Sequence, residues 1–139
     1  MNGGVKGGTR LVLAIMLAAV PAACRPAAAG EEFETVELTI HYSHFDPSTL
    51  EFPPGRTVRF IVHNTDPIDH EFILGDTRVQ DVHELGTEAH HPPRPGEMSV
   101  PAGTTRTTTY TFTKPGALIF GCHLPGHYAF GMRGLVTVA

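Results

Sequence analysis

Three side chains that can bind a transition metal lie close together near the C-terminus: Cys122, His127 and Met132. They stand within 11 residues, in a segment that joins two predicted strands. Soft sulfur ligands together with imidazole favour copper or zinc over magnesium or calcium. Two histidines and one cysteine in a trigonal plane, with a weak axial methionine, form the site of electron-transfer copper proteins. The segment supplies three such ligands, so a second histidine must come from elsewhere in the chain.

His70 is the strongest candidate for that second histidine. It opens a short predicted strand after a turn that contains Pro67, so its loop and the cysteine loop could meet at one end of a β-sandwich. His63 is the nearest rival, but it alternates with apolar strand residues, and a surface position is the usual one for such a histidine. His123 follows Cys122 directly, and adjacent strand residues point to opposite faces. We therefore expect His123 beside the site or on the surface.

Other readings of this loop are weaker. Taken singly, Cys122 and Met132 are ordinary core residues, and only their combination with His127 indicates a metal. Zinc sites are built from cysteine, histidine and carboxylate ligands rather than methionine. A binuclear copper centre lacks a second cysteine to bridge two metals, and a copper oxidase lacks a partner domain or further histidine motifs. The loop therefore predicts one copper ion.

Short alternating segments separated by proline and glycine turns position these residues. Gly (15) and Pro (12) are frequent, which is typical of a turn-rich all-β protein. Strands are predicted at 36–42, 50–52, 58–64, 70–74, 98–100, 104–113, 117–122 and 134–138. We expect an all-β sandwich or barrel of seven to eight strands. Segment 76–95 lacks periodicity and is predicted to be an irregular excursion with one helical turn.

The N-terminus has the features of an export signal. Lys6 and Arg10 precede an apolar run about ten residues long, which is too short to span a bilayer. Cys24 follows two alanines, as at the end of a bacterial lipobox, although Pro21 stands where an aliphatic residue is usual. Cys24 is therefore a candidate for lipidation. The alternative is cleavage after Ala29, which would discard this cysteine.

The predicted organisation is a signal peptide (1–23), a linker (24–32) and one folded domain (33–139). If Cys24 is removed or lipidated, Cys122 is the only thiol of the domain, and a metal explains an unpaired thiol in an oxidising compartment. The formal charge is −4 and no basic stripe is present, so nucleic acid is not an expected partner. We expect a periplasmic or cell-surface protein that contacts the membrane only through a lipid anchor.

The sequence resembles the plastocyanin/azurin family of cupredoxins over nearly all of 34–139. Segment 43–47 resembles the early Phe-x-Pro signature of plastocyanin-like domains, and segment 69–72 resembles the part that bears the first histidine ligand. The Cys-x₄-His-x₄-Met spacing is similar to that of rusticyanin and auracyanin. The resemblance implies a Greek-key cupredoxin fold with one type 1 (blue) copper. The implied ligands are His70, Cys122, His127 and Met132.

The chain departs from the family after the first histidine, where many members carry asparagine and this one has Glu71. The side-chain bonding around the copper loops is therefore expected to differ, and Asn64 is a candidate to tie these loops together. Apolar residues near His127 are predicted to form a docking patch. They are Leu124, Pro125, Ala129 and Phe130, with Ile68 nearby.

The excursion at 76–95 contains several metal-binding side chains. A second metal site could be formed by His83, His90 and His91, with Glu84 and Glu88. The alternative is a solvated histidine-rich loop.

The resemblance implies an electron carrier rather than an enzyme. Such a protein passes single electrons between extracytoplasmic redox partners, such as a cytochrome, an oxidase or a reductase, and changes no bond in a substrate. The alternative is a copper-handling protein for tolerance or delivery, which the nine histidines of the chain would allow. The partner and the oligomeric state do not follow from the sequence.

Overall fold

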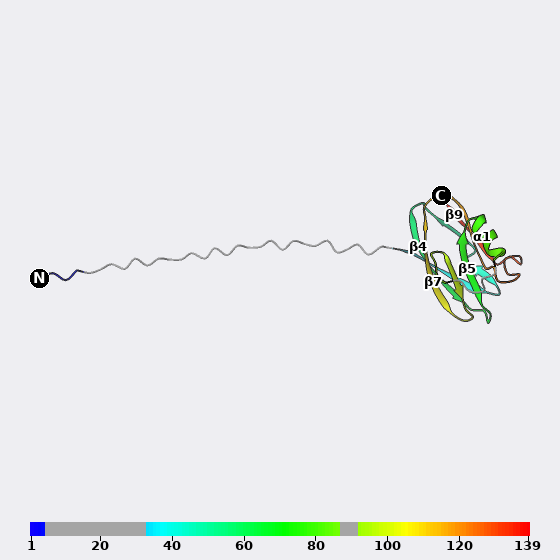
Figure 1. Cartoon of the computed structure of the whole chain (residues 1–139), viewed down its shortest axis with the longest axis horizontal. Coiled ribbons are helices and arrows are strands. Elements are labelled where there is room, and N and C mark those ends of the chain that lie inside the picture. Colours follow the sequence, from blue (N-terminus) through cyan, green and yellow to red (C-terminus); the bar gives the residue numbers. More distant parts are fainter. Residues whose placement is uncertain (5–32, 87–91) are drawn as a thin grey trace. The chain divides into compact units, whose positions relative to one another are not determined.

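The computed structural model of the protein describes residues 1–4, 33–86 and 92–139. The predicted signal peptide beyond residue 4, the linker with Cys24, and His90 and His91 lie outside the described residues. The strands and the helix all belong to the unit Glu31–Ala139, which is coloured from cyan to red in Figure 1.

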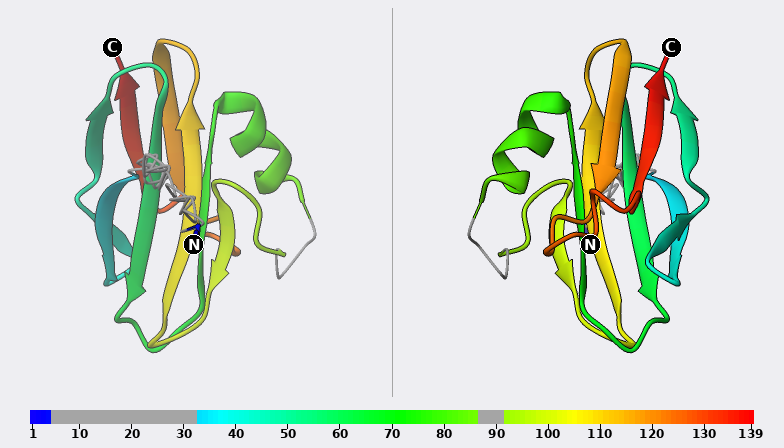
Figure 2. Two further views of the ribbon diagram at one scale, coloured as in Figure 1. Left: turned by 90° about the vertical axis from the view of Figure 1, so that its left-hand side faces the viewer. Right: turned by 90° about the vertical axis from the view of Figure 1, so that its right-hand side faces the viewer.

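Two β-sheets pack against each other, as the views of Figure 2 show. The four-stranded sheet has the order β2-β1-β4-β7, with β1 at Glu34–His41, β2 at His44–Asp46, β4 at Arg56–Asn64 and β7 at Thr105–Phe112. The five-stranded sheet has the order β3-β9-β8-β5-β6, with β3 at Thr49–Phe52, β9 at Arg133–Val138, β8 at Gly116–Gly121, β5 at His70–Gly75 and β6 at Glu97–Val100. The all-β sandwich expected from the sequence is confirmed.

The alternating pattern of β4 shows how the core forms. Val58, Phe60 and Val62 are fully buried, whereas the side chains between them face outward. The ring of Phe60 lies 5.3 Å from that of Phe72 in the other sheet, measured between centroids. Burial of such aromatic and β-branched side chains supplies the main stabilising free energy of a sandwich. The two packed sheets therefore support the loops that carry the predicted metal ligands.

One helix covers the outer face of β5 and β8. This helix, α1 (Thr77–Glu84), begins at Asp76, whose side chain accepts a hydrogen bond from the Val79 N–H at 3.0 Å. Gln80 is only 2% exposed, and its amide donates to the carbonyls of Ile73 (3.2 Å) and Ile119 (2.8 Å). Every residue of β5 is buried because β5 is covered on both faces.

Two details differ from the sequence expectations. The excursion contains an eight-residue helix rather than one turn. The described residues form nine strands rather than seven to eight, because the three-residue β2 pairs with β1. No helix among the described residues is long and apolar enough to cross a membrane.

Candidate metal centre

The predicted ligand loop spans the gap between β8 and β9. These strands are antiparallel, and their last pair is Gly121 with Arg133. Cys122 and Met132 therefore face each other at the neck of the loop, where the Cys122 N–H donates to the Met132 carbonyl at 3.1 Å. The Met132 N–H donates in turn to the carbonyl of His127 at 3.0 Å. These two hydrogen bonds bring the backbones of all three residues together.

A tight turn places His127 within the loop. The His127 N–H donates to the Leu124 carbonyl at 2.9 Å, and Gly126 has a φ of +85°. A type II turn needs a residue of positive φ at its third position, usually glycine, and often has proline at its second position. In the turn from Leu124 to His127, Gly126 and Pro125 occupy these two positions. The chain thus reverses within four residues and returns His127 toward Cys122.

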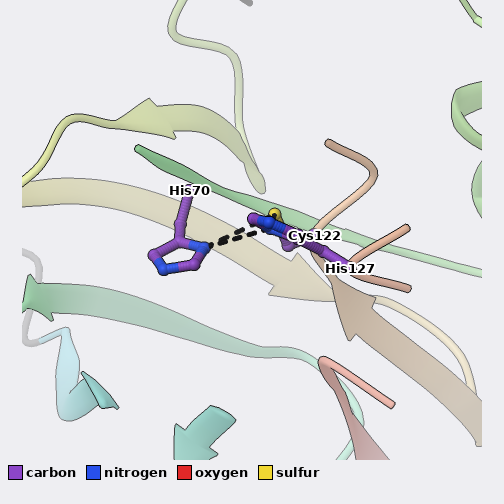
Figure 3. A group of neighbouring side chains, drawn as sticks. All are labelled: His70, Cys122 and His127. Carbon is purple, nitrogen blue, oxygen red and sulfur yellow. Dashed lines mark hydrogen bonds between the residues drawn. The ribbon is translucent and has the colours of Figure 1, made fainter. Parts of the chain in front are cut away.

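The metal-binding atoms of three predicted ligands meet at one point, drawn in Figure 3. His127 Nδ1 lies 3.2 Å from Cys122 Sγ and 3.2 Å from His70 Nδ1, and His70 Nδ1 lies 3.9 Å from Cys122 Sγ. Metal–nitrogen and metal–sulfur bonds of about 2.0 to 2.3 Å allow two ligand atoms to lie up to about 4.6 Å apart. All three separations fall below that limit, so one ion fits between these atoms.

The site is largely shielded from water. Cys122 and His70 are 0% and 1% exposed, whereas His127 is half-buried. Burial raises the pKa of the Cys122 thiol to about 11, because the buried thiolate lacks solvation and a nearby Glu71 carboxylate repels it. Burial also lowers the pKa of His127, and the charge of His70 adds to this effect. A cation among these residues would favour the thiolate and neutral imidazole that copper requires.

Met132, the predicted axial ligand, is buried at 1% exposure in the same apolar cluster as Cys122. Its main chain lies beside both loop ligands through the hydrogen bonds described above. A buried thioether next to a cysteine and two histidines suits a weak axial ligand. The axial role of Met132 stays a prediction.

Glu71 links the strand of His70 to the cysteine loop, whereas the hydrogen bonds of Asn64 are made to the loop before His70 and to the end of β6. The Glu71 N–H donates to Cys122 Sγ at 3.3 Å, and its carboxylate accepts from the His123 N–H at 3.2 Å. Asn64 donates from its amide to the carbonyls of Ile68 (2.8 Å) and Val100 (2.9 Å). The glutamate that replaces the family's usual asparagine therefore bonds the cysteine loop, while Asn64 bonds the loop that leads to His70.

The two rival histidines lie away from the metal-binding atoms. His63 Nδ1 lies 2.9 Å from the Thr105 hydroxyl on the outer face of β4. The ring of His123 turns toward α1, where its nitrogens lie 2.8 Å from Glu84 Oε2 and 2.8 Å from Gln80 Oε1. Neither histidine belongs to the cluster of His70 and its partners.

Of the predicted second metal site, only His83 and Glu84 lie among the described residues, and Glu88 lies outside them. His83 Nδ1 donates to the Val79 carbonyl at 2.8 Å, and its Nε2 lies 3.7 Å from Glu97 Oε2. His90 and His91 lie outside the described residues. In 33–86 and 92–139, three or more histidine, cysteine or carboxylate side chains converge only at His70, Cys122 and His127.

Apolar side chains surround the half-buried edge of His127. Phe130 is 88% exposed and Ile68 46% exposed, and Pro125 is exposed as well. Leu124 is half-buried and lines a surface depression together with Ile68, Pro125 and His127. Ile68, Leu124 and Pro125 of the predicted docking patch therefore lie beside His127, and the Phe130 ring lies next to Gly126 in the same loop.

Sequence reasoning missed Asp66, a buried carboxylate that lies 2.9 Å from His70 Nε2. Burial alone would raise the pKa of Asp66, but hydrogen bonds from the N–H groups of Ser43 and Tyr42 and the interaction with His70 lower it below its ordinary value. The available signal was an acidic residue four positions before the histidine in the same loop.

The chain is similar to known cupredoxins and to relatives that are named as copper proteins. The profile of the cupredoxin-like domain matches residues 13–138. The copper-resistant cuproprotein CopI of Rubrivivax gelatinosus is 36% identical over 120 residues, which cover 82% of this chain and 72% of that protein. The protein of the same name from Pseudomonas aeruginosa is 29% identical over 147 residues, covering 82% of this chain and 81% of that protein.

Solved structures share the fold. Auracyanin from Roseiflexus castenholzii is 27% identical with a TM-score of 0.65, over 76% of this chain and 96% of that one. Auracyanin A, a blue copper protein of Chloroflexus aurantiacus, is 22% identical with a TM-score of 0.61, over 76% of this chain and 98% of that one. These matches show that the chain belongs to the cupredoxin-like family, and its cluster of two histidines and a cysteine fits one copper ion at a type 1 site.

Proposed function

We propose that this protein is an exported electron carrier whose residues hold one copper ion, and that the reversible one-electron couple of this ion lets it accept and pass on single electrons. The observation that carries the proposal is the convergence of His70 Nδ1, Cys122 Sγ and His127 Nδ1 within 3.9 Å of one another. Bound copper supplies the redox chemistry, and the chain fixes the positions of its ligands.

The fold supports electron transfer because it restrains the ligands from several sides. His70 begins a strand that is buried on both faces, and the cysteine loop is closed by hydrogen bonds at its neck. The Glu71 N–H that donates to Cys122 Sγ joins the two segments. When the ligands are held in place, they move little as the copper changes between Cu(I) and Cu(II). A low reorganisation energy of this kind suits rapid electron transfer.

The half-buried edge of His127 supports contact with a partner at this end of the molecule. Exposed Ile68 beside it, and exposed Phe130 in the same loop as His127, provide an apolar surface on which another redox protein could dock. We propose a cytochrome, an oxidase or a reductase as partner. In this proposal the protein changes no bond in a substrate and is not an enzyme.

The location proposed for this carrier is outside the cytoplasm, in the periplasm or at the cell surface. The apolar run behind Lys6 and Arg10 supports export, and Cys24 supports a lipid anchor. A soluble domain on such an anchor could meet partners at the membrane.

A second candidate function is copper tolerance. It is favoured by the relatives from Rubrivivax gelatinosus and Pseudomonas aeruginosa, which are both named copper-resistant cuproproteins. In this role the same cluster would bind copper so that less of it reacts elsewhere. The two functions are compatible, because a redox-active site also withholds its copper.

Two experiments separate these functions. Electron carriage predicts that the reduced, copper-loaded protein reduces a soluble cytochrome in stopped-flow mixing, and that Phe130→Ala slows this reaction without changing the visible spectrum. Tolerance predicts that cells lacking the gene become sensitive to copper and are rescued by the wild type but not by Cys122→Ser. Fast electron exchange without any copper phenotype would support the carrier alone. The phenotype without exchange would support tolerance alone.

A further inference from the structure

A buried carboxylate next to the copper cluster has a role that the ligand set does not explain. Asp66 is 6% exposed and lies in the loop between β4 and β5. Its Oδ2 is 2.9 Å from Nε2 of His70, whose side chain is fully buried. Burying a carboxylate costs free energy unless hydrogen bonds satisfy it, so the contacts around Asp66 indicate what holds it there.

Asp66 is fixed by the tip of a distant hairpin. Its Oδ1 accepts from the Tyr42 N–H at 2.7 Å, and its Oδ2 accepts from the Ser43 N–H at 2.8 Å. Its own main chain is also held, because its N–H donates to Asn64 Oδ1 at 3.0 Å and its carbonyl accepts from the Gly103 N–H at 3.2 Å. The carboxylate therefore has little freedom to turn away from His70.

The hairpin itself has an unfavourable backbone. Tyr42 and Ser43 join β1 to β2 with φ values of 51° and 56°, both in the left-handed region. Two-residue turns of this kind favour asparagine and glycine, because the left-handed region is unfavourable for most other residues. Strained backbone persists where surrounding contacts hold it in place. Here both strained residues donate to one carboxylate, so the turn and Asp66 form a single unit.

This unit determines which nitrogen of His70 can bind a metal. A neutral imidazole carries one proton, and the nitrogen without it has the free lone pair. A carboxylate can only accept, so the contact with Asp66 keeps the proton on Nε2. The lone pair of Nδ1 then faces the cluster, 3.2 Å from His127 Nδ1.

We propose that Asp66, held by the Tyr42–Ser43 turn, is a positioning residue of the copper site that acts through His70. It fixes the tautomer and the ring orientation of His70 and makes its Nδ1 a stronger donor, as carboxylates do for metal-bound histidines elsewhere. The inference rests on the copper site of the proposed function, and it holds whether the protein carries electrons or protects against copper.

Asp66→Asn is the sharpest test because an amide cannot replace both oxygens. If the amide oxygen takes the Oδ1 position, the NH₂ group faces Ser43 N–H and His70 Nε2, and only the Nδ1–H tautomer of His70 avoids a clash of donors. If the oxygen takes the Oδ2 position, the NH₂ group faces the Tyr42 N–H. Either arrangement loses a hydrogen bond of the unit.

Asp69→Asn is the matched control. Asp69 lies in the same loop, is exposed, and accepts from the Ala102 N–H at 2.8 Å through Oδ1, which asparagine retains. The Asp69→Asn substitution removes the same charge at a similar place in the chain, but the hydrogen bond of Asp69 is made to the Ala102 N–H and not to the His70 ring. A general effect of charge would therefore appear in both variants, and positioning only in Asp66→Asn.

The first measurement is the affinity of the full-length protein for Cu(I), in competition with a chelator. Asp66→Asn is expected to lose about 10- to 100-fold, as is typical for such outer partners, while Asp69→Asn stays at the wild-type value. Equal affinities of Asp66→Asn and wild type would overturn the proposal, as would equal losses in the two variants.

The second measurement is the nitrogen NMR spectrum of the His70 ring in the copper-free protein at about pH 8, where an ordinary imidazole is neutral. The wild type should show the Nε2–H tautomer alone, and Asp66→Asn should show a fraction of the Nδ1–H tautomer, which comes from the arrangement in which its NH₂ group faces His70 Nε2. A wild type in the Nδ1–H tautomer overturns the proposal even if the variant fails to fold. A wild type that binds no copper would contradict the proposed function instead, and the tautomer would still decide the role of Asp66.

Discussion

Raising the pH above 9 in the absence of copper should destabilise the folded protein through the Cys122 thiol. Burial raises the pKa of this thiol from 9.0 to about 11. Unfolding exposes the thiol and restores its ordinary pKa. Between these two values the unfolded chain releases the proton while the folded protein keeps it, so the free energy of unfolding falls as the pH rises.

The slope is about 1.4 kcal/mol for each pH unit. The full stabilisation is present well below pH 9, and roughly 2 kcal/mol is lost by the time the pH reaches the folded pKa of about 11. That loss is a large part of the stability of a small domain, which is about 5 to 15 kcal/mol. The effect is therefore large enough to measure by unfolding in urea.

The assay compares copper-free wild type with Cys122→Ala at about pH 8.5 and about pH 10.5. Tyrosines and lysines titrate in both proteins, so the difference between the two pH dependences isolates the thiol. The wild type should lose about 2 kcal/mol more than the variant, and bound copper should abolish this excess because it takes the place of the thiol proton. Parallel pH dependences in the copper-free proteins would refute the reasoning about Cys122.

Three further changes test other parts of the structure. Met132→Leu should keep the colour of the copper protein and raise its reduction potential in voltammetry, by about 60 mV for each tenfold loss of Cu(II) affinity; an unchanged potential would show that Met132 is not the axial ligand. Gln80→Leu should lower the free energy of unfolding by about 2 kcal/mol, because two carbonyls lose their donor. The exposed Asp81→Ala on the same helix should change it little, and equal effects would contradict the anchoring role of Gln80. Cys24→Ala should move the protein from the membrane fraction to the soluble extracytoplasmic fraction, because two acyl chains hold a domain on a membrane; wild-type protein that is already soluble, with an N-terminus at Gly30, would exclude the anchor.

The sandwich and the ligand loop could be predicted because their signals are local. Alternation along β4 follows directly from the period of a strand, and Cys122, His127 and Met132 stand within one loop. The sequence favours His70 over His63 only because the loop before His70 is expected to meet the cysteine loop at one end of the sandwich. The structure brings His70 to the cluster and leaves His63 on the outer face.

The remaining features depend on contacts that a sequence pattern does not reveal. The inward side of α1 is occupied by Gln80, so the helix lacks the apolar stripe that normally indicates one. The role of Asp66 arises from Tyr42 and Ser43, which are 24 and 23 residues away in the chain. These hydrogen bonds come from backbone N–H groups, which every residue except proline has. The sequence therefore gives no signal that Tyr42 and Ser43 contact Asp66.

The central claim is that one copper ion binds between His70, Cys122 and His127, and the visible absorption spectrum during titration with Cu(II) tests it most directly. A Cys122 thiolate bound to Cu(II) should give an intense charge-transfer band that saturates at one equivalent. Cys122→Ser should remain folded and lack the band. A wild type that stays colourless, or a Cys122→Ser variant of equal colour, would contradict the assignment of this centre.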